Sequence, residues 1–259
     1  MEYVNVIAHR GANVNAPQNT LPAFEKAIEL GCDGFETDIH LTKDGIPVVC
    51  HNFTIDETSN GKGEIKDYTF DELREFDFGS YKNEKFKGTK IPTLDEFLDV
   101  YAKKKMRVLD IELKSRVFGE SGTELAKKTV EAVIEHGLID TLLISSFDPA
   151  LLVVCKKIDK RCKTGLLYVA NSALGARIAL RPFKYAEDTG CDALHPMFIH
   201  VNSLYVKMAH EKGLQVNPWT VDNEIIAKTL IKMGVDGLIS DCPDTMNKVL
   251  GRTADFYGE

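Results

Sequence analysis

The sequence has no run of about 18 consecutive apolar residues, the length that a helix needs to cross a bilayer. Its first residues, Met1–Asn5, also lack the basic segment followed by an apolar one that marks a secretory signal. We therefore expect no integral membrane segment, and a soluble protein located in the cytoplasm.

Two further features are missing. The six cysteines are scattered without a Cys-x-x-Cys pair, which argues against a thiolate zinc site or a disulfide framework and favours buried free thiols. An excess of positive charge is absent too, because the formal net charge is -7. Such a surface repels a phosphate backbone, so nucleic acid is not an expected partner. Any anionic small molecule must then be held by local positive groups.

What the sequence does have is an alternation of short apolar runs with longer helical patterns along its 259 residues. Helical patterns cover Thr20–Leu30, Leu94–Lys104, Glu124–His136 and Asn223–Met233. Eight runs are predicted as strands: Val4–Ala8, Gly34–Ile39, Arg107–Leu113, Thr141–Ser145, Lys163–Leu167, Ala193–His195, Gln215–Trp219 and Gly237–Ser240. Eight βα units in about 250 residues are typical of an α/β fold of the (β/α)8 barrel type, with 1–259 as one domain.

A Gly-x-Asp pattern recurs between helical patterns and strands, at Gly31–Asp33, Gly190–Asp192 and Gly234–Asp236. Glycine there predicts a left-handed residue that ends the helix. The rhythm is interrupted after the second strand by residues 53–90. In a barrel, this insertion would lie at the carboxyl-terminal face, either as a lid or specificity segment or as a surface loop without a function.

The second strand carries two acids of the same parity, Glu36 and Asp38, which the two-residue period of a strand points into the barrel together with His40. Two buried carboxylates must take up a proton, pair with a cationic side chain or bind a metal. We expect a metal, with a structural ion pair as the alternative.

The third strand ends in Asp110-Ile111-Glu112-Leu113-Lys114 and is the expected neighbour of the second. Glu112 can therefore converge with Glu36 and Asp38 to form an all-oxygen site, which suits Mg²⁺ or Ca²⁺ better than zinc. Lys114 would lie beside this site as a fixed positive charge. Asp110 is expected deeper in the barrel, with a partner.

The first strand is followed by His9-Arg10-Gly11, and the apolar run 46–50 is followed by His51. The planar guanidinium of Arg10 suits a phosphate, and glycine permits close approach of the backbone. His9 and His51 could act as a general acid and a general base, in an order that the sequence leaves open.

The other five histidines are weaker candidates for a role in catalysis. His40 is expected to support the site from behind. His136 and His210 lie in helical patterns and are expected at the surface, whereas His195 and His200 follow the sixth strand and could line the pocket.

These residues belong to motifs that together resemble the glycerophosphodiester phosphodiesterases over nearly the whole chain. The motifs are His9–Gly11, Pro17–Leu21, Glu36–Asp38, Leu41–Gly45, Pro47–His51, Ile91–Leu94, Glu112–Lys114, Trp219–Val221 and Gly234–Asp241. The resemblance implies a (β/α)8 barrel, a divalent metal on Glu36, Asp38 and Glu112, and acid/base roles for His9 and His51. It also implies that Arg10 and Lys114 hold the phosphate and that Trp219 lines the pocket.

Two positions depart from this pattern. The family usually has Glu where this chain has Gln18, and Asp where it has Asn52. Each change removes a negative charge near the site, which bears on metal affinity, histidine pKa and substrate choice.

The expected activity is hydrolysis of a glycerophosphodiester, such as glycerophosphocholine, to glycerol phosphate and an alcohol, with one Mg²⁺, Ca²⁺ or Mn²⁺ ion. Two alternatives stay open. One is cleavage of a lysophospholipid or another lipid headgroup, which would require apolar surface in the insertion, where Phe53, Phe70, Phe76, Phe78 and Phe86 are candidates. The other is a catalytically weakened barrel that only binds phosphodiesters. The sequence leaves the oligomeric state open.

Overall fold

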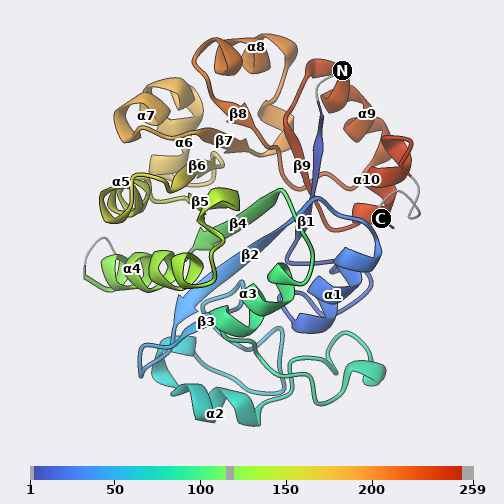
Figure 1. Cartoon of the computed structure of the whole chain (residues 1–259), viewed down its shortest axis with the longest axis vertical. Helices are drawn as coiled ribbons and strands as arrows, with labels where there is room; N and C mark the ends of the chain where they lie inside the picture. Colours follow the sequence, from blue (N-terminus) through green and yellow to red (C-terminus); the bar gives the residue numbers. More distant parts are fainter. Residues whose placement is uncertain (1–2, 115–119, 253–259) are drawn as a thin grey trace.

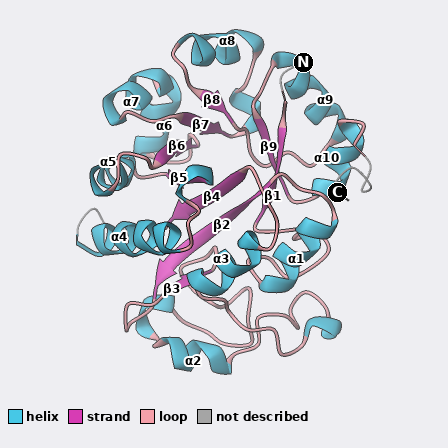
Figure 2. Cartoon of the chain, viewed as in Figure 1, coloured by secondary structure: helices cyan, strands magenta, loops and turns pink. Residues whose placement is uncertain are grey.

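A computed structural model describes residues 3–114 and 120–252 of the chain. Eight parallel strands lie side by side in the order β8-β7-β6-β5-β4-β2-β1-β9, and helices surround them as a ring (Figures 1 and 2). The strands of the sheet are β1 Asn5–His9, β2 Gly34–Leu41, β4 Val108–Leu113, β5 Leu142–Ser146, β6 Lys163–Tyr168, β7 Ala193–Pro196, β8 Gln215–Val216 and β9 Gly237–Ser240. The predicted (β/α)8 barrel is confirmed, with most strand ends within one or two residues of those expected.

The helices of the described residues follow the strands in turn. The α-helices are α1 Leu21–Glu29, α2 Phe70–Glu75, α3 Leu94–Ala102, α4 Glu120–Glu135, α5 Pro149–Ile158, α6 Ala173–Leu180, α7 Pro182–Thr189, α8 Ser203–Glu211, α9 Glu224–Met233 and α10 Pro243–Val249. Short 3-10 helices are η1 Ile65–Asp67, η2 Glu84–Phe86, η3 Ile139–Thr141 and η4 Phe198–His200. The three glycines predicted to end helices do so with positive φ, +75° at Gly31, +66° at Gly190 and +90° at Gly234.

The predicted strand Gln215–Trp219 is too long, because the regular ladder of β8 ends at Val216. Pro218 has no backbone N–H to donate to a neighbouring strand, so the ladder is interrupted there. The chain still links β8 to β9, since the N–H of Ile239 donates to the carbonyl of Pro218 (3.1 Å) and the N–H of Val221 donates to that of Ile239 (2.9 Å). These bonds nearly close the barrel.

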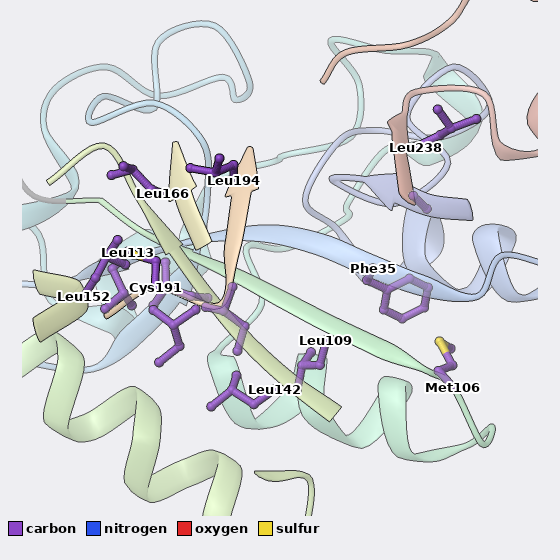
Figure 3. Close-up of a cluster of buried hydrophobic side chains, with 14 of the residues drawn as sticks. Phe35, Met106, Leu109, Leu113, Leu142, Leu152, Leu166, Cys191, Leu194 and Leu238 are labelled. Carbon is purple, nitrogen blue, oxygen red and sulfur yellow. The ribbon is translucent and has the colours of Figure 1, made fainter. Parts of the chain in front are cut away.

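The core lies between the strands and the helices. Phe35 points outward from β2, as its parity predicts, and its ring centroid lies 5.1 Å from that of Phe24 in α1 and 5.8 Å from that of Tyr101 in α3. Figure 3 places Phe35 near Leu109 and Met106 in this layer, with Leu142 and Leu166 on the next strands. The outward residues of the strands thus hold the helices in place, and the inward residues are free to form a polar centre.

One further strand, β3 (Pro47–Val49), runs antiparallel to the end of β2. It leads into the insertion 53–90, which lies outside the helix ring beside β3 (Figure 1). The insertion builds a small hydrophobic cluster of its own with β3, made of Val48, Cys50, Ile55, Ile65, Leu73, Phe78 and Ile91.

All six cysteines are free thiols, as expected, and five of them are buried. In the described part of the chain, no helix is long and apolar enough to span a membrane.

Candidate active site

Three carboxylates converge inside the barrel. Parallel pairing of β2 with β4 sets Asp38 opposite Glu112, and Glu36 lies one inward position earlier on β2. One oxygen from each of the three side chains lies within 4.8 Å of the others, and all three residues are buried. The arrangement offers oxygen ligands alone, the donor set that hard divalent cations prefer.

Positive charge at this centre comes from two side chains. The Nζ atom of Lys114 lies 2.9 Å from Asp38 and 2.7 Å from Glu112, and the Nε atom of Arg10 lies 3.5 Å from Asp38. The ion pair considered as an alternative to a metal is therefore present. It does not balance the site, because Asp110 adds a fourth buried acid, and four carboxyl groups face two cations.

The excess of acid appears in the pKa values. Burial and the charge of Asp38 raise the pKa of Glu36 well above its ordinary value, and burial raises that of Glu112 to about 7. Burial also pushes the pKa of Asp38 upward, but Lys114 and Arg10 outweigh it and hold that pKa below its ordinary value. Without a further cation, part of this centre stays protonated near neutral pH, so the residues fit a divalent ion.

His9 ends β1 beside Glu36. Its Nδ1 atom lies 2.6 Å from the Oδ1 atom of Asp241, which follows β9, and its Nε2 atom lies 3.8 Å from Glu36. The side-chain amide of Asn13 donates to the same oxygen of Asp241 (2.6 Å). The imidazole is thus fixed in position between two acids, with Asp241 as the partner of its Nδ1 atom.

His51 enters from the other side, just beyond β3. Its Nδ1 atom lies 2.6 Å from the Oδ1 atom of Asn52, whose Nδ2 atom donates to Glu57 (2.8 Å). Because that amide oxygen can only accept, His51 carries its proton on Nδ1 and has a lone pair on Nε2. Burial lowers the pKa of His51 to about 4. His51 is therefore neutral at pH 7.

Arg10 adopts an unusual backbone conformation, with φ of +58°. Its N–H donates to the backbone oxygen of Glu36 (2.9 Å), and its Nη1 atom donates to the Oε1 atom of Gln18 (2.7 Å). Gly11 follows with φ of +79°, and a Cβ there would lie 2.6 Å from the backbone of Ala23. Glycine is needed at this position for packing against α1, a reason different from the expected approach to a phosphate.

A pocket of about 470 Å³ opens above the carboxylates. The Nε1 atom of Trp219 donates to the backbone oxygen of His195 (2.7 Å), and the ring of Phe147 lies edge-on to the indole at 5.8 Å. The lining residues are His9, Arg10, Glu36, His51, Asp110, Glu112, Lys114, Ser145, Phe147, Leu167, Val169, Asn171, Ser172, His195, Trp219, Thr220 and Ile239. Two histidines, two cations and an acidic centre thus share one pocket with an aromatic wall.

Comparison with known proteins gives this pocket a context. The sequence model of the glycerophosphoryl diester phosphodiesterase family matches residues 9–245. The chain belongs to this family. A glycerophosphodiester phosphodiesterase of Caldanaerobacter subterraneus subsp. tengcongensis is 40% identical over 241 residues, which are 93% of this chain and 95% of the relative.

Solved structures of the glycerophosphodiester phosphodiesterase family have the same fold. A phosphodiesterase of Oleispira antarctica, in complex with the product sn-glycerol-3-phosphate, aligns with a TM-score of 0.84 and 30% identity over 95% of this chain and 96% of that one. A putative glycerophosphoryl diester phosphodiesterase of Silicibacter pomeroyi aligns with a TM-score of 0.85 and 25% identity, over 97% of this chain and 95% of its own.

The remaining histidines of this family member divide into two groups. His40 is buried behind the site, with its Nε2 atom 3.3 Å from the carbonyl of His51, and His195 is buried in the pocket wall. His200 is not part of the pocket: it stacks on Tyr168 outside it. His210 is exposed, but His136 is half-buried.

Asp110 lies below the three carboxylates, as its position on β4 predicts. The hydroxyl of Ser145 donates to its Oδ1 atom (2.7 Å), and its Oδ2 atom lies 3.4 Å from the Nδ1 atom of His195. Burial raises the pKa of Asp110 to about 8 and lowers that of His195 to about 3. Both groups are therefore neutral over most of the physiological range.

Sequence reasoning gave no role to three residues that hold the site in place. Asp241 orients His9, Asn19 donates to Asp38 (2.8 Å) and accepts from the hydroxyl of Thr37 (2.9 Å), and Phe147 supports the indole of Trp219. Asp241 and Asn19 both lie inside the motifs of the resemblance, so their positions were a usable signal. No pattern in the sequence distinguishes Phe147.

Proposed function

We propose that this protein hydrolyses glycerophosphodiesters to glycerol phosphate and an alcohol. One observation carries the proposal: His9, His51, two cationic side chains and two of the three converging acids, Glu36 and Glu112, border a single pocket. Membership of the glycerophosphoryl diester phosphodiesterase family supports it, as do the name of the Caldanaerobacter relative and the glycerol phosphate product bound by the Oleispira protein.

The proposal includes one divalent cation, Mg²⁺ or Ca²⁺, with Mn²⁺ as a further candidate. Glu36, Asp38 and Glu112 would hold it, because their oxygens converge and their negative charge exceeds that of the nearby cations. When bound, such an ion polarises a phosphoryl oxygen and neutralises charge that develops in the transition state. Arg10 and Lys114 would bind the other phosphate oxygens, Arg10 through a planar fork and Lys114 as a point charge.

The two histidines have different surroundings, and we assign them different roles. His51 is neutral with a free lone pair on Nε2, so it suits the general base that deprotonates the nucleophile, either a glycerol hydroxyl or water. His9 is held between Asp241 and Glu36, so it suits the general acid that protonates the leaving alkoxide. With water as the nucleophile, a proton must then pass from His51 back to His9 through solvent. With the glycerol hydroxyl as the nucleophile, the first step gives a cyclic phosphodiester, and a second step in which water opens the ring gives glycerol phosphate; the two histidines exchange roles in that step and regain their starting protonation.

The decisive experiment is a turnover assay with purified protein and glycerophosphocholine, with and without Mg²⁺, Ca²⁺ or Mn²⁺. We expect release of glycerol phosphate that chelation abolishes and a divalent ion restores. A matched pair of variants tests the proposed ligand: Glu112→Gln should lose activity, and Glu131→Gln, an exposed acid on α4 outside the pocket, should keep it. Full turnover with excess chelator would exclude the metal requirement. Binding without any turnover would exclude this function and favour a weakened, binding-only barrel.

We also propose a cytoplasmic location. Six cysteines without a disulfide are typical of a reducing compartment.

A further inference from the structure

Large apolar side chains on the surface gather on one sector of the barrel. Of the eleven that are exposed among the described residues, five follow the carboxyl ends of the neighbouring strands β5 to β8: Phe147, Leu180, Ile199, Leu204 and Ile225. Leu180, Ile199 and Leu204 are 81%, 63% and 64% exposed. A single exposed leucine needs no explanation, whereas several on one face indicate a binding surface.

A hollow of about 480 Å³ lies between α6, α7 and α8, and Leu180 is one of its lining residues. Leu180 and Met208 lie on opposite helices around it, and Ile199 and Leu204 are chain neighbours of two lining residues. The lining consists of Tyr168, Ala179, Leu180, Arg181, Pro182, Phe183, Lys184, His200, Tyr205 and Met208. The hollow is therefore mostly aromatic and aliphatic, with basic groups among its lining residues.

Two arginines, Arg177 and Arg181, supply positive charge in this sector, although the chain as a whole has a net charge of -7. Lys184 and Lys207 pair with acids one turn further along their helices. Arg177 and Arg181 are exposed, and no ion pair within the described part of the chain involves either of them. Exposed cations beside protruding apolar groups are the combination with which peripheral proteins bind anionic bilayers.

The basic apolar rim, defined by Arg177, Leu180, Arg181, Ile199 and Leu204, adjoins the active-site pocket. Asn171 and Ser172 line the pocket and lead directly into α6. On the other side, the N–H of Phe198 at the start of η4 donates to the backbone oxygen of Trp219 (2.9 Å). A flat surface that contacts the rim would lie beside the mouth of the pocket.

We propose that the basic apolar rim docks on an anionic lipid bilayer and brings the pocket to phosphodiester headgroups at that surface. Docking at such a surface does not depend on the proposed function.

The surface suits a bilayer better than a second copy of the chain. In a symmetric dimer through this rim, each copy would bring Arg177 and Arg181 against the same two residues of its partner, and like charges would repel. The insertion 53–90, where apolar surface was considered for a lipid substrate, has fewer exposed large apolar side chains than the rim. Phe78 is buried, Phe70 and Phe76 pack against the small cluster, and Tyr81 is the one large hydrophobic residue there that counts as exposed.

Co-sedimentation of the full chain with vesicles of phosphatidylcholine, with and without phosphatidylglycerol, tests docking directly. We expect binding that increases with phosphatidylglycerol. Joint replacement Leu180→Ser, Ile199→Ser and Leu204→Ser should weaken it about 10-fold or more. Arg177→Gln with Arg181→Gln should remove the dependence on phosphatidylglycerol. Since these side chains are exposed and lie outside the pocket, hydrolysis of glycerophosphocholine should not change.

Matched controls lie at the amino-terminal side of the barrel. Ile134→Ser with Ile158→Ser removes two exposed apolar groups, and Lys157→Gln with Lys160→Gln removes two exposed cations. Both pairs should bind vesicles as the unchanged protein does. No binding to phosphatidylglycerol vesicles, or equal losses in controls and rim variants, would overturn the proposal. So would a dimer in solution that the three serine substitutions convert to a monomer, because the rim would then be a protein interface.

Discussion

The Nδ1 atom of His51 lies 2.6 Å from the side-chain oxygen of Asn52. His9, by contrast, faces a carboxylate oxygen of Asp241 at the same distance. An amide supplies only a dipole, whereas a carboxylate supplies a full charge that stabilises an imidazolium. The two histidines of one pocket thus differ in the charge of a single partner atom.

Replacement of Asn52 by aspartate should raise the pKa of His51, since a nearby negative charge favours the protonated imidazole. A general base works only when neutral, so the acidic limb of the kcat/KM profile should move to higher pH. Metal affinity should also increase. The pH profile and metal titration of Asn52→Asp check this, with Gln18→Glu expected to give a smaller parallel effect. Superimposable curves would mean that both amides serve only the local backbone.

Loss of either histidine should lower kcat by about 100-fold or more, as expected for general acid/base groups. His9→Ala and His51→Ala should keep the far-ultraviolet circular dichroism spectrum and the metal affinity of the unchanged protein. His210→Ala, at an exposed position outside the pocket, is the control. Near-normal kcat in either variant, on a substrate with a poor alkoxide leaving group, would contradict its assigned role.

Asp241→Asn tests the orientation of His9. The amide keeps the size of the side chain but removes the carboxylate that faces the Nδ1 atom of His9 and orients its ring, so we expect kcat to decrease by about 10- to 100-fold. KM should change little, because Asp241 does not line the pocket. Asp236→Asn, which removes the partner of the distant His210, is a matched control. A change in KM alone would point to substrate binding instead.

Arg10→Lys replaces a planar fork by a point charge and also removes the hydrogen bond to Gln18. We expect KM to increase, with a decrease in kcat if the second phosphate contact forms only in the transition state. Steady-state kinetics on glycerophosphocholine measure both constants. An unchanged kcat/KM would assign Arg10 to packing or to its ion pair with Asp38.

The pH dependence of stability tests the acidic centre. The folded-state pKa of Glu112 is raised from 4.5 to about 7, so the metal-free protein loses stability as pH increases through this range. The lowered pKa of Asp38 has the opposite sign, but its contribution is lost only at pH below about 4. The lowered pKa values of His40, His51 and His195 add stability as pH increases to about 6.5. Tm in chelator should therefore decrease between pH 6.5 and 8, and Mg²⁺ or Ca²⁺ should offset the decrease. Equal Tm values across this range, with and without metal, would mean that no ion binds here.

The alternation of β and helical patterns was sufficient to predict the barrel, and strand parity predicted which side chains of β2 and β4 point inward. The two-residue period of a strand and the order of the strands determine those directions, so the sequence alone predicts them. Contacts between distant segments could not be: Asp241 meets His9 across 232 positions because β9 and β1 are neighbours in the sheet. Two other features depend likewise on contacts between distant segments. Gly11 is needed because its backbone packs against Ala23, and His200 lies outside the pocket because it stacks on Tyr168.

The small cluster beneath the insertion has a consequence for how heat inactivates the protein. Val48 of β3 and Cys50, the residue after β3, belong to it, and His51 follows directly, so this histidine is anchored on a cluster separate from the core of the barrel. Small clusters under surface segments open with less free energy than a main core. Loss of activity on warming should therefore precede the cooperative unfolding of the barrel, with amide hydrogens of residues 46–91 exchanging ahead of those in β4 and β5.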